Sequence, residues 1–279
     1  MLRKIFDFFI FSSLYISLCA VVMVWQTYYL VLHSMPPFHF FAFVFFATMC
    51  SYNFHWWLTP ESAGFSDRIQ WAAGHKGWHL WLCFLGLAGT AISFLYIREH
   101  WIALAFGAFI TFLYSAPKLP QPIFRSLKKI AIGKTLFLSF VWTYVTSVLP
   151  VFIDNKLLQG ESLLFAVGRF GLIYAICILF DYRDREDDKR DGIRSMITYF
   201  GEKGIDLIFS ISLSIFVIST LILYYYNYPI QMLLIILFPG LLVAGLYRYA
   251  KRNFSDYLYY FVLDGLMMLS GLLIMILRI

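Results

Sequence analysis

Charged residues are scarce in this chain of 279 residues. Asp, Glu, Lys and Arg make up 14% of it, whereas 61% is hydrophobic and 20% is aromatic. Soluble globular domains carry about 25% charged residues, so this shortage excludes an ordinary soluble domain and predicts a polytopic membrane protein. The net charge of +6 is interpreted as a membrane-orientation signal and not as a nucleic-acid-binding surface.

Cysteine is also rare, and several catalytic motifs are missing. The four cysteines lie inside apolar runs without a C-x-x-C pair, so a packing role is expected in place of disulfides or zinc ligation. The sequence has no P-loop, no H-E-x-x-H, no C-x-x-C-H and no nucleophile elbow. The first apolar run is too long for a removable signal peptide and lacks a small-residue cleavage site.

Long apolar runs are abundant. Nine of them are long enough to cross a hydrocarbon layer of about 30 Å. They predict an all-α fold of nine transmembrane helices in a single domain, 1–279. The nine runs are 8–32, 37–58, 79–97, 101–116, 130–152, 161–180, 205–226, 229–247 and 257–277.

Lys and Arg are distributed unevenly between the two sets of loops that this helix count creates. One side carries 17 of them and the other side carries 3. Because cytoplasmic loops of membrane proteins are enriched in Lys and Arg, we expect the N-terminus and the acidic loop in the cytoplasm and the C-terminus outside. This predicts a multi-pass protein of an inner or plasma membrane.

A dense acidic and basic segment follows the sixth run. If the helix continues through it, five aspartates fall within an arc of about 120°. Adjacent carboxylates repel one another unless a cation that prefers oxygen ligands neutralises them, so we interpret this face as a magnesium site that carries a phosphorylated substrate. The alternative is a solvated helix with ion pairs along its length. The five are Asp181, Asp184, Asp187, Asp188 and Asp191.

The spacing of three of these acids sharpens the interpretation. Asp181, Asp184 and Asp188 form a D-x-x-D-x-x-x-D pattern, followed by Gly-Ile-Arg-Ser at 192–195. This combination resembles the second aspartate-rich motif of the UbiA superfamily of intramembrane prenyltransferases. The resemblance implies that the three acids are catalytic and bind Mg²⁺. It also implies helices around a central cavity, with cytoplasmic cap loops at about 59–78 and 181–204.

Two further elements point to a diphosphate. Tyr114 and Lys118 form a Y-x-x-x-K pair that resembles a second UbiA element, whose side chains contact the donor diphosphate. A phenol and an ammonium group can stabilise charge on a leaving diphosphate, although an interfacial tyrosine beside a lipid-facing lysine has the same spacing. Arg68 also has two interpretations, as a phosphate ligand or as a positive-inside charge.

The first aspartate motif of the superfamily, N-D-x-x-D-x-x-x-D, is expected at the end of the second run. Here Asn53 matches, Phe54 and Trp57 stand in place of two acids, and Glu61 keeps the last carboxylate. The resemblance implies that Asn53 belongs to the diphosphate site and that Glu61 is a further metal ligand. His55 is interpreted as an interfacial histidine because magnesium prefers oxygen ligands.

The activity implied by the resemblance is transfer of an isoprenyl group from a polyprenyl diphosphate to a small aromatic or lipid-like acceptor. Two alternatives stay open. Phe54 and Trp57 suggest a relative that binds a lipid diphosphate or a partner protein without turnover. Lys134, Arg169 and Asp264, which lie within apolar runs, suggest an ion-coupled transporter, although a buried Arg169–Asp264 pair is expected.

Overall fold

The computed structural model describes residues 2–59, 66–116, 134–190 and 196–278, with no account of the side chains of 187–190 and 196–198. Every regular element in this described part is helical, which confirms the all-α prediction. The longer helices are α1 (Leu2–Phe11), α2 (Leu14–Thr27), α3 (Phe38–Leu58), α4 (Asp67–Gly74), α5 (Lys76–Tyr96), α6 (Trp101–Ser115), α8 (Lys134–Thr143), α9 (Leu149–Ile153), α10 (Gly160–Arg190), α11 (Met196–Ile222), α12 (Ile230–Ala250) and α13 (Asp264–Leu277).

Short helical turns of other types extend several of these helices. They are η1 (Tyr28–Leu32) after α2, η3 (Arg98–His100) before α6, η6 (Tyr144–Val148) between α8 and α9, η7 (Leu223–Tyr226) after α11 and η8 (Leu258–Leu263) before α13. Each continues the backbone of its neighbour, so the combined segments are long enough to cross a bilayer.

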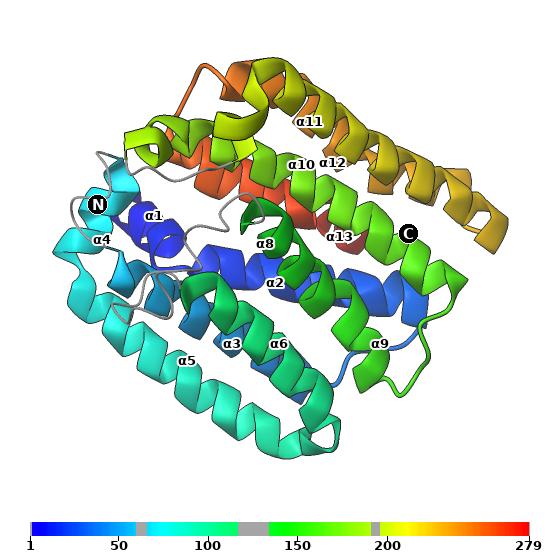
Figure 1. Cartoon of the computed structure of the whole chain (residues 1–279). Coiled ribbons are helices and arrows are strands. Elements are labelled where there is room, and N and C mark those ends of the chain that lie inside the picture. Colours follow the sequence, from blue (N-terminus) through cyan, green and yellow to red (C-terminus); the bar gives the residue numbers. More distant parts are fainter. Residues whose placement is uncertain (1, 60–65, 117–133, 191–195, 279) are drawn as a thin grey trace.

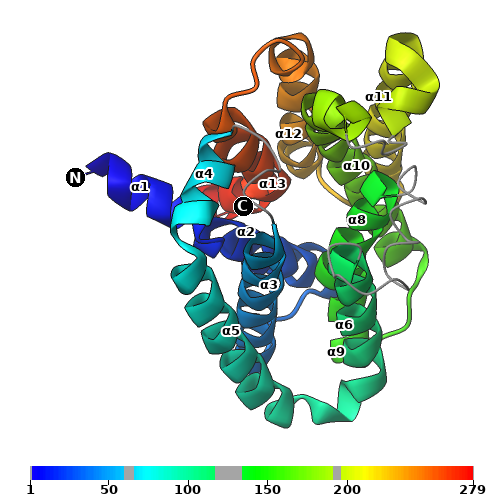
Figure 2. The same cartoon turned by 60° about the vertical axis from the view of Figure 1, so that its left-hand side comes forward.

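Seven helical segments of the described residues are long and apolar enough to span a membrane. The helices α3 and α6 are not among them. In α3, His39, Asn53 and His55 lower the mean hydropathy of a helix that is 21 residues long, and α6 has only 15 residues. Both run beside the spanning helices in the bundle (Figures 1 and 2). The total of nine crossings therefore stays a prediction.

The first apolar run, predicted as one helix over 8–32, is two helices. Ser13 has φ 68° and ψ 10°, a left-handed conformation that ends α1 before α2 begins. α1 projects sideways from the bundle (Figure 2), with Leu2, Ile5 and Phe6 exposed. A helix with exposed apolar side chains beside a membrane bundle suits the membrane surface.

The bundle consists of two groups of helices on either side of α2. The helices α10 to α13 form one group and α3, α5 and α6 form the other, as the two views in Figures 1 and 2 agree. The N-terminus, α4, the end of α10 and the connection between α12 and η8 lie at one end of the bundle, and the C-terminus lies at the other. The described parts of these Lys- and Arg-bearing segments therefore lie at one end of the bundle, and the side of the membrane that this end faces stays a prediction.

Two close helix contacts depend on glycine. A Cβ added at Gly86 of α5 would lie 2.8 Å from the backbone nitrogen of Cys50 and from the carbonyl oxygen of Phe46 in α3. At Gly171 of α10 it would lie 2.6 Å from the carbonyl oxygen of Ser212 in α11. Small residues allow helix backbones to approach closely in membranes, where packing drives helix association.

The end of α3 is closed by Thr59, whose hydroxyl donates to the carbonyl oxygen of His55 at 2.9 Å. The next described helix, α4, begins at Asp67, and the Ser66 hydroxyl accepts a hydrogen bond from the backbone N–H of Ile69. Ser is a favourable N-cap because its oxygen satisfies one of the free N–H groups of the first turn.

Candidate functional site

A polar cavity lies near the charged end of the bundle, and we call it the rim cavity. It has a volume of about 310 Å³. Its wall carries three carboxylates, Asp181, Asp184 and Asp264, and two cationic side chains, Lys134 and Arg183. The helices α3, α6, α8, α10 and α13 and the turn η8 contribute to it, so residues far apart in the sequence meet here.

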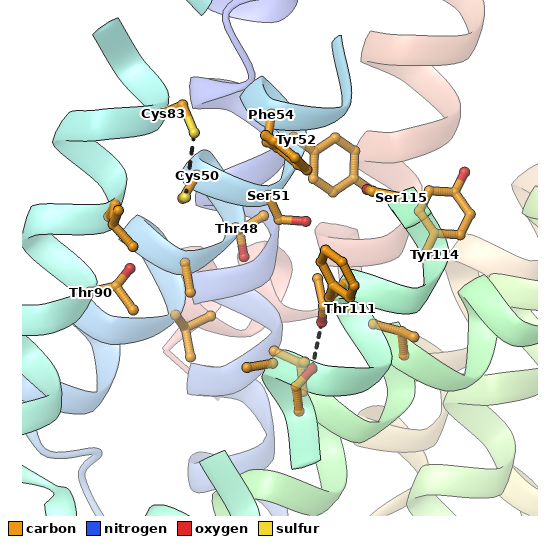
Figure 3. A pocket seen from close by; sticks show the side chains of 18 of the residues that line it. Thr48, Cys50, Ser51, Tyr52, Phe54, Cys83, Thr90, Thr111, Tyr114 and Ser115 are labelled. Atoms are coloured by element: carbon orange, nitrogen blue, oxygen red, sulfur yellow. Dashed lines mark hydrogen bonds between the residues drawn. The ribbon is translucent and has the colours of Figure 1, made fainter. Parts of the chain in front are cut away.

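An apolar chamber of about 590 Å³ adjoins the rim cavity, lined mainly by α3, α5, α6 and α8 (Figure 3). The two share six residues of their walls, so they lie side by side. The shared residues are Ser51, Tyr52, Tyr114, Ser115, Leu138 and Trp142. A charged compartment beside an apolar one suits a ligand with an anionic head and a hydrocarbon chain.

Asp181 and Asp184 lie one turn apart on α10, and both face the rim cavity. Asp181 accepts a hydrogen bond from the Thr135 hydroxyl of α8. Asp184 forms an ion pair with its neighbour Arg183, whose Nε lies 2.8 Å from Oδ1. The sequence prediction that these acids share a face is therefore confirmed for this pair.

Arg183 links Asp184 to the start of the last helix. Its Nη2 donates to the Tyr260 hydroxyl at 2.7 Å, and its Nη1 lies 3.4 Å from Asp256 Oδ1. Asp256 Oδ2 also accepts from the backbone N–H of Arg68 at 2.8 Å. Burial raises the pKa of Asp256, and the Arg68 N–H and the Arg183 charge oppose that shift.

Arg68 lies behind the cavity wall. Its guanidinium carbon is 4.3 Å from the ring centre of Trp56 and 4.2 Å from that of Tyr260, and both rings line the rim cavity. Burial lowers the pKa of Arg68, while the rings provide cation–π contacts. Arg68 itself is not among the residues that line the cavity. It supports the wall from behind, through its contacts with Trp56 and Tyr260.

Asn53 also points away from the cavity. Its amide nitrogen donates to the carbonyl oxygens of Ser12 at 2.9 Å and Met49 at 2.8 Å, and its oxygen lies 2.7 Å from His79 Nδ1. It is fully buried and joins the α1–α2 break to α3 and α5. These contacts satisfy the Asn53 amide within the fold.

Tyr114 lies in the wall between the two compartments, and its role in binding a diphosphate stays a prediction. It lines both compartments, and its ring stacks on His55 with the centroids 5.3 Å apart. His55 Nδ1 is 3.3 Å from the Ser115 hydroxyl oxygen. Lys118 and Glu61 lie outside the described residues, as does the side chain of Asp188, which belongs to the last turns of α10.

Comparison with known proteins gives one finding that decides the family. The model of the UbiA prenyltransferase family matches residues 75–263, more than half of the chain. The chain belongs to the UbiA prenyltransferase family. It is an integral membrane protein of the prenyltransferase type. No curated protein matches the chain, and no solved structure matches it either.

The place of the first UbiA acidic motif is occupied by aromatic residues. Phe54 and Trp57 line the apolar chamber, with their ring centroids 6.3 Å apart. These side chains extend the hydrocarbon-lined surface where a UbiA motif would supply carboxylates. The charged side chains that line the rim cavity are contributed by α8, α10 and α13 in the described part of the chain.

The donor atoms fit a magnesium ion that is shared with a diphosphate. Asp181 and Asp184 offer hard oxygen ligands, and magnesium is commonly held by one or two carboxylates together with substrate phosphates. Among the residues that the structure describes, no group of three or more His, Cys, Asp or Glu side chains is close enough to hold a metal ion. The fit is thus to a substrate-bridged ion and not to a cage made by the protein alone.

The expected Arg169–Asp264 pair is wrong. Arg169 of α10 donates to neutral oxygens of Met23, Thr27, Thr146 and Gln26, at distances of 2.7 to 2.9 Å. Asp264 instead lines the rim cavity. The acceptors that bind Arg169 are uncharged carbonyl, hydroxyl and amide groups. A sequence prediction that considers only acidic partners for a buried arginine therefore misses them.

Three residues of the rim cavity were missed in the sequence. In the sequence, Thr135 and Tyr260 are polar residues within apolar runs, and Arg183 is one of many charged residues in its segment. Thr135 donates to Asp181 from another helix, Arg183 pairs with Asp184 and Asp256, and Tyr260 accepts a hydrogen bond from Arg183. Only Arg183 left a signal, since it lies between two acids of the D-x-x-D motif.

Proposed function

We propose that the protein transfers an isoprenyl group from a polyprenyl diphosphate to a small aromatic or lipid-like acceptor. The observation that carries the proposal is the shared wall of the rim cavity and the apolar chamber. Asp181 and Asp184 line the first compartment, and hydrocarbon side chains line the second. A prenyl diphosphate has the same division into an anionic head and an apolar chain.

The apolar chamber provides the binding energy for the chain. Burial of apolar surface is worth about 25 cal/mol per Å². Phe43, Phe84 and Leu149 are among the side chains that such a chain would contact. The chamber also excludes water from the carbon that loses the diphosphate, which protects an allylic cation from hydrolysis.

The rim cavity would hold the diphosphate. Lys134 and Arg183 bring positive charge to its wall, and the Tyr114 hydroxyl adds a hydrogen-bond donor beside them. Such groups stabilise negative charge as it develops on the leaving diphosphate. Asp181 and Asp184, with Asp188 from the same motif, would hold magnesium together with the diphosphate oxygens. Charge neutralisation on those oxygens is what the bound ion supplies.

A transfer assay tests the proposal. Purified protein in liposomes is given Mg²⁺, radiolabelled farnesyl diphosphate and a panel of phenolic and lipid acceptors. We expect a prenylated product, and Asp184→Asn should lower kcat by about 10² to 10³, the usual loss when one charge-stabilising group is removed. Glu186→Gln on the same helix is the matched control, because Glu186 is exposed and is not among the cavity-lining residues.

A second candidate is a relative that binds a lipid diphosphate without turnover. The replacement of two acids of the first motif by Phe54 and Trp57 favours it. Saturable, magnesium-dependent binding of farnesyl diphosphate, with no product from any acceptor and no free diphosphate released, would support this candidate over the transferase.

A further inference from the structure

Asp264 is a carboxylate of the rim cavity that the acidic motif does not include. It is the first residue of α13, and Tyr260 and Met267, about one turn before and after it, line the same cavity. The side chain is thus presented to the cavity by the last helix, across from α10. The acids of the D-x-x-D motif face the same space from α10.

The carboxylate of Asp264 makes no hydrogen bond and no ion pair with any of the described residues, although two cationic groups act on it electrostatically. Those groups are occupied elsewhere. Arg183 binds Asp184, Asp256 and Tyr260, and the Arg68 guanidinium lies between the rings of Trp56 and Tyr260. Buried polar groups in proteins usually have a partner, so a cavity-facing carboxylate without one indicates a ligand with a hydrogen-bond donor.

The position of Asp264 separates it from the diphosphate end of the cavity. Its electrostatic neighbours include Cys177 of α10 and Tyr52 of α3. Cys177 precedes Asp181 by four residues, which is about 6 Å along a helix axis. Tyr52 belongs to the wall that the rim cavity shares with the apolar chamber. Asp264 therefore lies near the turn of α10 that precedes Asp181 and near the wall shared by the two compartments, where the proposed function places the reacting carbon of a bound donor.

We propose that Asp264 is the catalytic base that binds the acceptor by its hydroxyl group and takes the hydroxyl proton; the assignment rests on the proposed function. As the bond between the allylic carbon and the diphosphate oxygen breaks, the electron pair leaves with the diphosphate. The acceptor oxygen, which loses its proton, forms the new bond to the allylic carbon. The proton passes to Asp264 and then to water after product release.

The surroundings favour a hydroxyl on an aromatic ring. The rings of Tyr52, Trp142 and Tyr260 line the same cavity as this carboxylate. Tyr52 OH accepts from Trp142 Nε1 at 3.0 Å, which fixes both rings in the wall. Aromatic side chains pack well against the faces and edges of aromatic ligands.

The first test measures binding and does not depend on turnover. The intact protein is treated with dicyclohexylcarbodiimide, an apolar carboxyl reagent, and modification of Asp264 is measured by peptide mass spectrometry. The probes are 4-octylphenol and 4-octylanisole, which differ by the hydroxyl proton and a methyl group. We expect protection by the phenol and none by the anisole. Equal protection by both probes, or protection by neither, would overturn the assignment.

The second test measures transfer of radiolabelled farnesyl from farnesyl diphosphate to 4-octylphenol. Asp264→Asn should lower kcat by about 10² to 10⁴, the range for general-base catalysis, while the KM for the donor stays unchanged. Asp264→Glu should recover part of the rate, and retained donor binding in both variants shows that they fold. An unchanged kcat in Asp264→Asn would overturn the assignment.

The two tests separate this inference from the proposed function. If 4-octylphenol protects Asp264 in the wild-type protein but receives no farnesyl group, the proposed function fails and the hydroxyl-binding site stands. If transfer occurs and Asp264→Asn retains it in full, the proposed function stands and the base is another group.

Discussion

Asp256 holds two buried arginines at the charged end of the bundle. It accepts a hydrogen bond from the backbone of Arg68, and it faces the guanidinium of Arg183, which also binds Asp184. A buried carboxylate of this kind supports a catalytic wall without touching a substrate. Its loss would leave Arg183 with one anionic partner in place of two.

Asp256→Leu should therefore destabilise the protein. Removing one partner of a buried ion pair costs about 3 to 5 kcal/mol, because the remaining charge stays buried. Thermal unfolding in detergent measures the effect. Asp206→Asn is the control. The Asp206 side chain is 52% exposed in its ion pair with Lys251. Exposed ion pairs contribute about 0 to 1 kcal/mol to the free energy of unfolding. Equal losses in the two variants would contradict this role of Asp256.

At the residue scale, the sequence predicted the site unevenly. Asp181, Asp184 and Tyr114 line the rim cavity as expected, because helical spacing and the position of a helix end can be read from the chain. Asn53 matches a family motif, yet its amide is bound within the fold. Asp264 could not be assigned, because its neighbours are set by the packing of three helices.

At the scale of helices, the contact between α3 and α5 forms one side of the apolar chamber. Gly86 allows the two backbones to approach, and next to it the Sγ atoms of Cys50 and Cys83 are 3.7 Å apart (Figure 3). All four cysteines are free, as the sequence predicts. The chamber wall at this point depends on the close approach of the two helices.

Gly86→Ala should destabilise the protein by about 1 to 3 kcal/mol, because overpacking forces a shift of backbone atoms that are 2.8 Å from the new Cβ. Gly77→Ala on the same helix is the matched control, since nothing lies within 4 Å of its Cβ position. Alanine favours a helix over glycine by about 1 kcal/mol, so this variant should be neutral or slightly more stable. Thermal unfolding compares the two, and equal stabilities would contradict the close contact.

A second measurement at this scale uses the cysteine pair. A mild oxidant should link Cys50 to Cys83 and protect both from alkylation, because side chains this close need only small movements to reach disulfide geometry. Peptide mass spectrometry identifies the linked residues. A disulfide that involves Cys19 or Cys177 instead would show that α3 and α5 do not pack in this register.

At the scale of the whole molecule, the two compartments adjoin within a bundle of apolar helices. The sequence predicted the helical class, because apolar runs are a local signal, and the orientation of the loops in the membrane stays a prediction. It did not predict the break at Ser13, which depends on the left-handed backbone of that residue. The family resemblance implied a central cavity, but it did not indicate which side chains of the separate helices line the apolar chamber.

Ala108→Trp should shorten the chamber. Ala108 of α6 lines it, and each methylene group kept out of an apolar site costs about 0.8 kcal/mol. We expect kcat/KM for geranylgeranyl diphosphate to fall by about 10- to 100-fold relative to dimethylallyl diphosphate, since about two or three carbons lose contact. Ala105→Trp is the control, because Ala105 is exposed on the same helix and does not line the chamber. The same change of ratio in both variants would contradict the assignment of the chamber.

The central claim is that one prenyl diphosphate occupies the rim cavity and the apolar chamber together. A farnesyl diphosphate analogue with a photoreactive group at the end of its chain tests this directly by peptide mapping after illumination. The account predicts labelling of chamber residues such as Thr48, Thr90 and Ala108, competition by unlabelled farnesyl diphosphate, and loss of labelling in Asp181→Asn/Asp184→Asn. Labelling confined to the outer faces of α11 and α12, or labelling that the unlabelled diphosphate does not reduce, would contradict it.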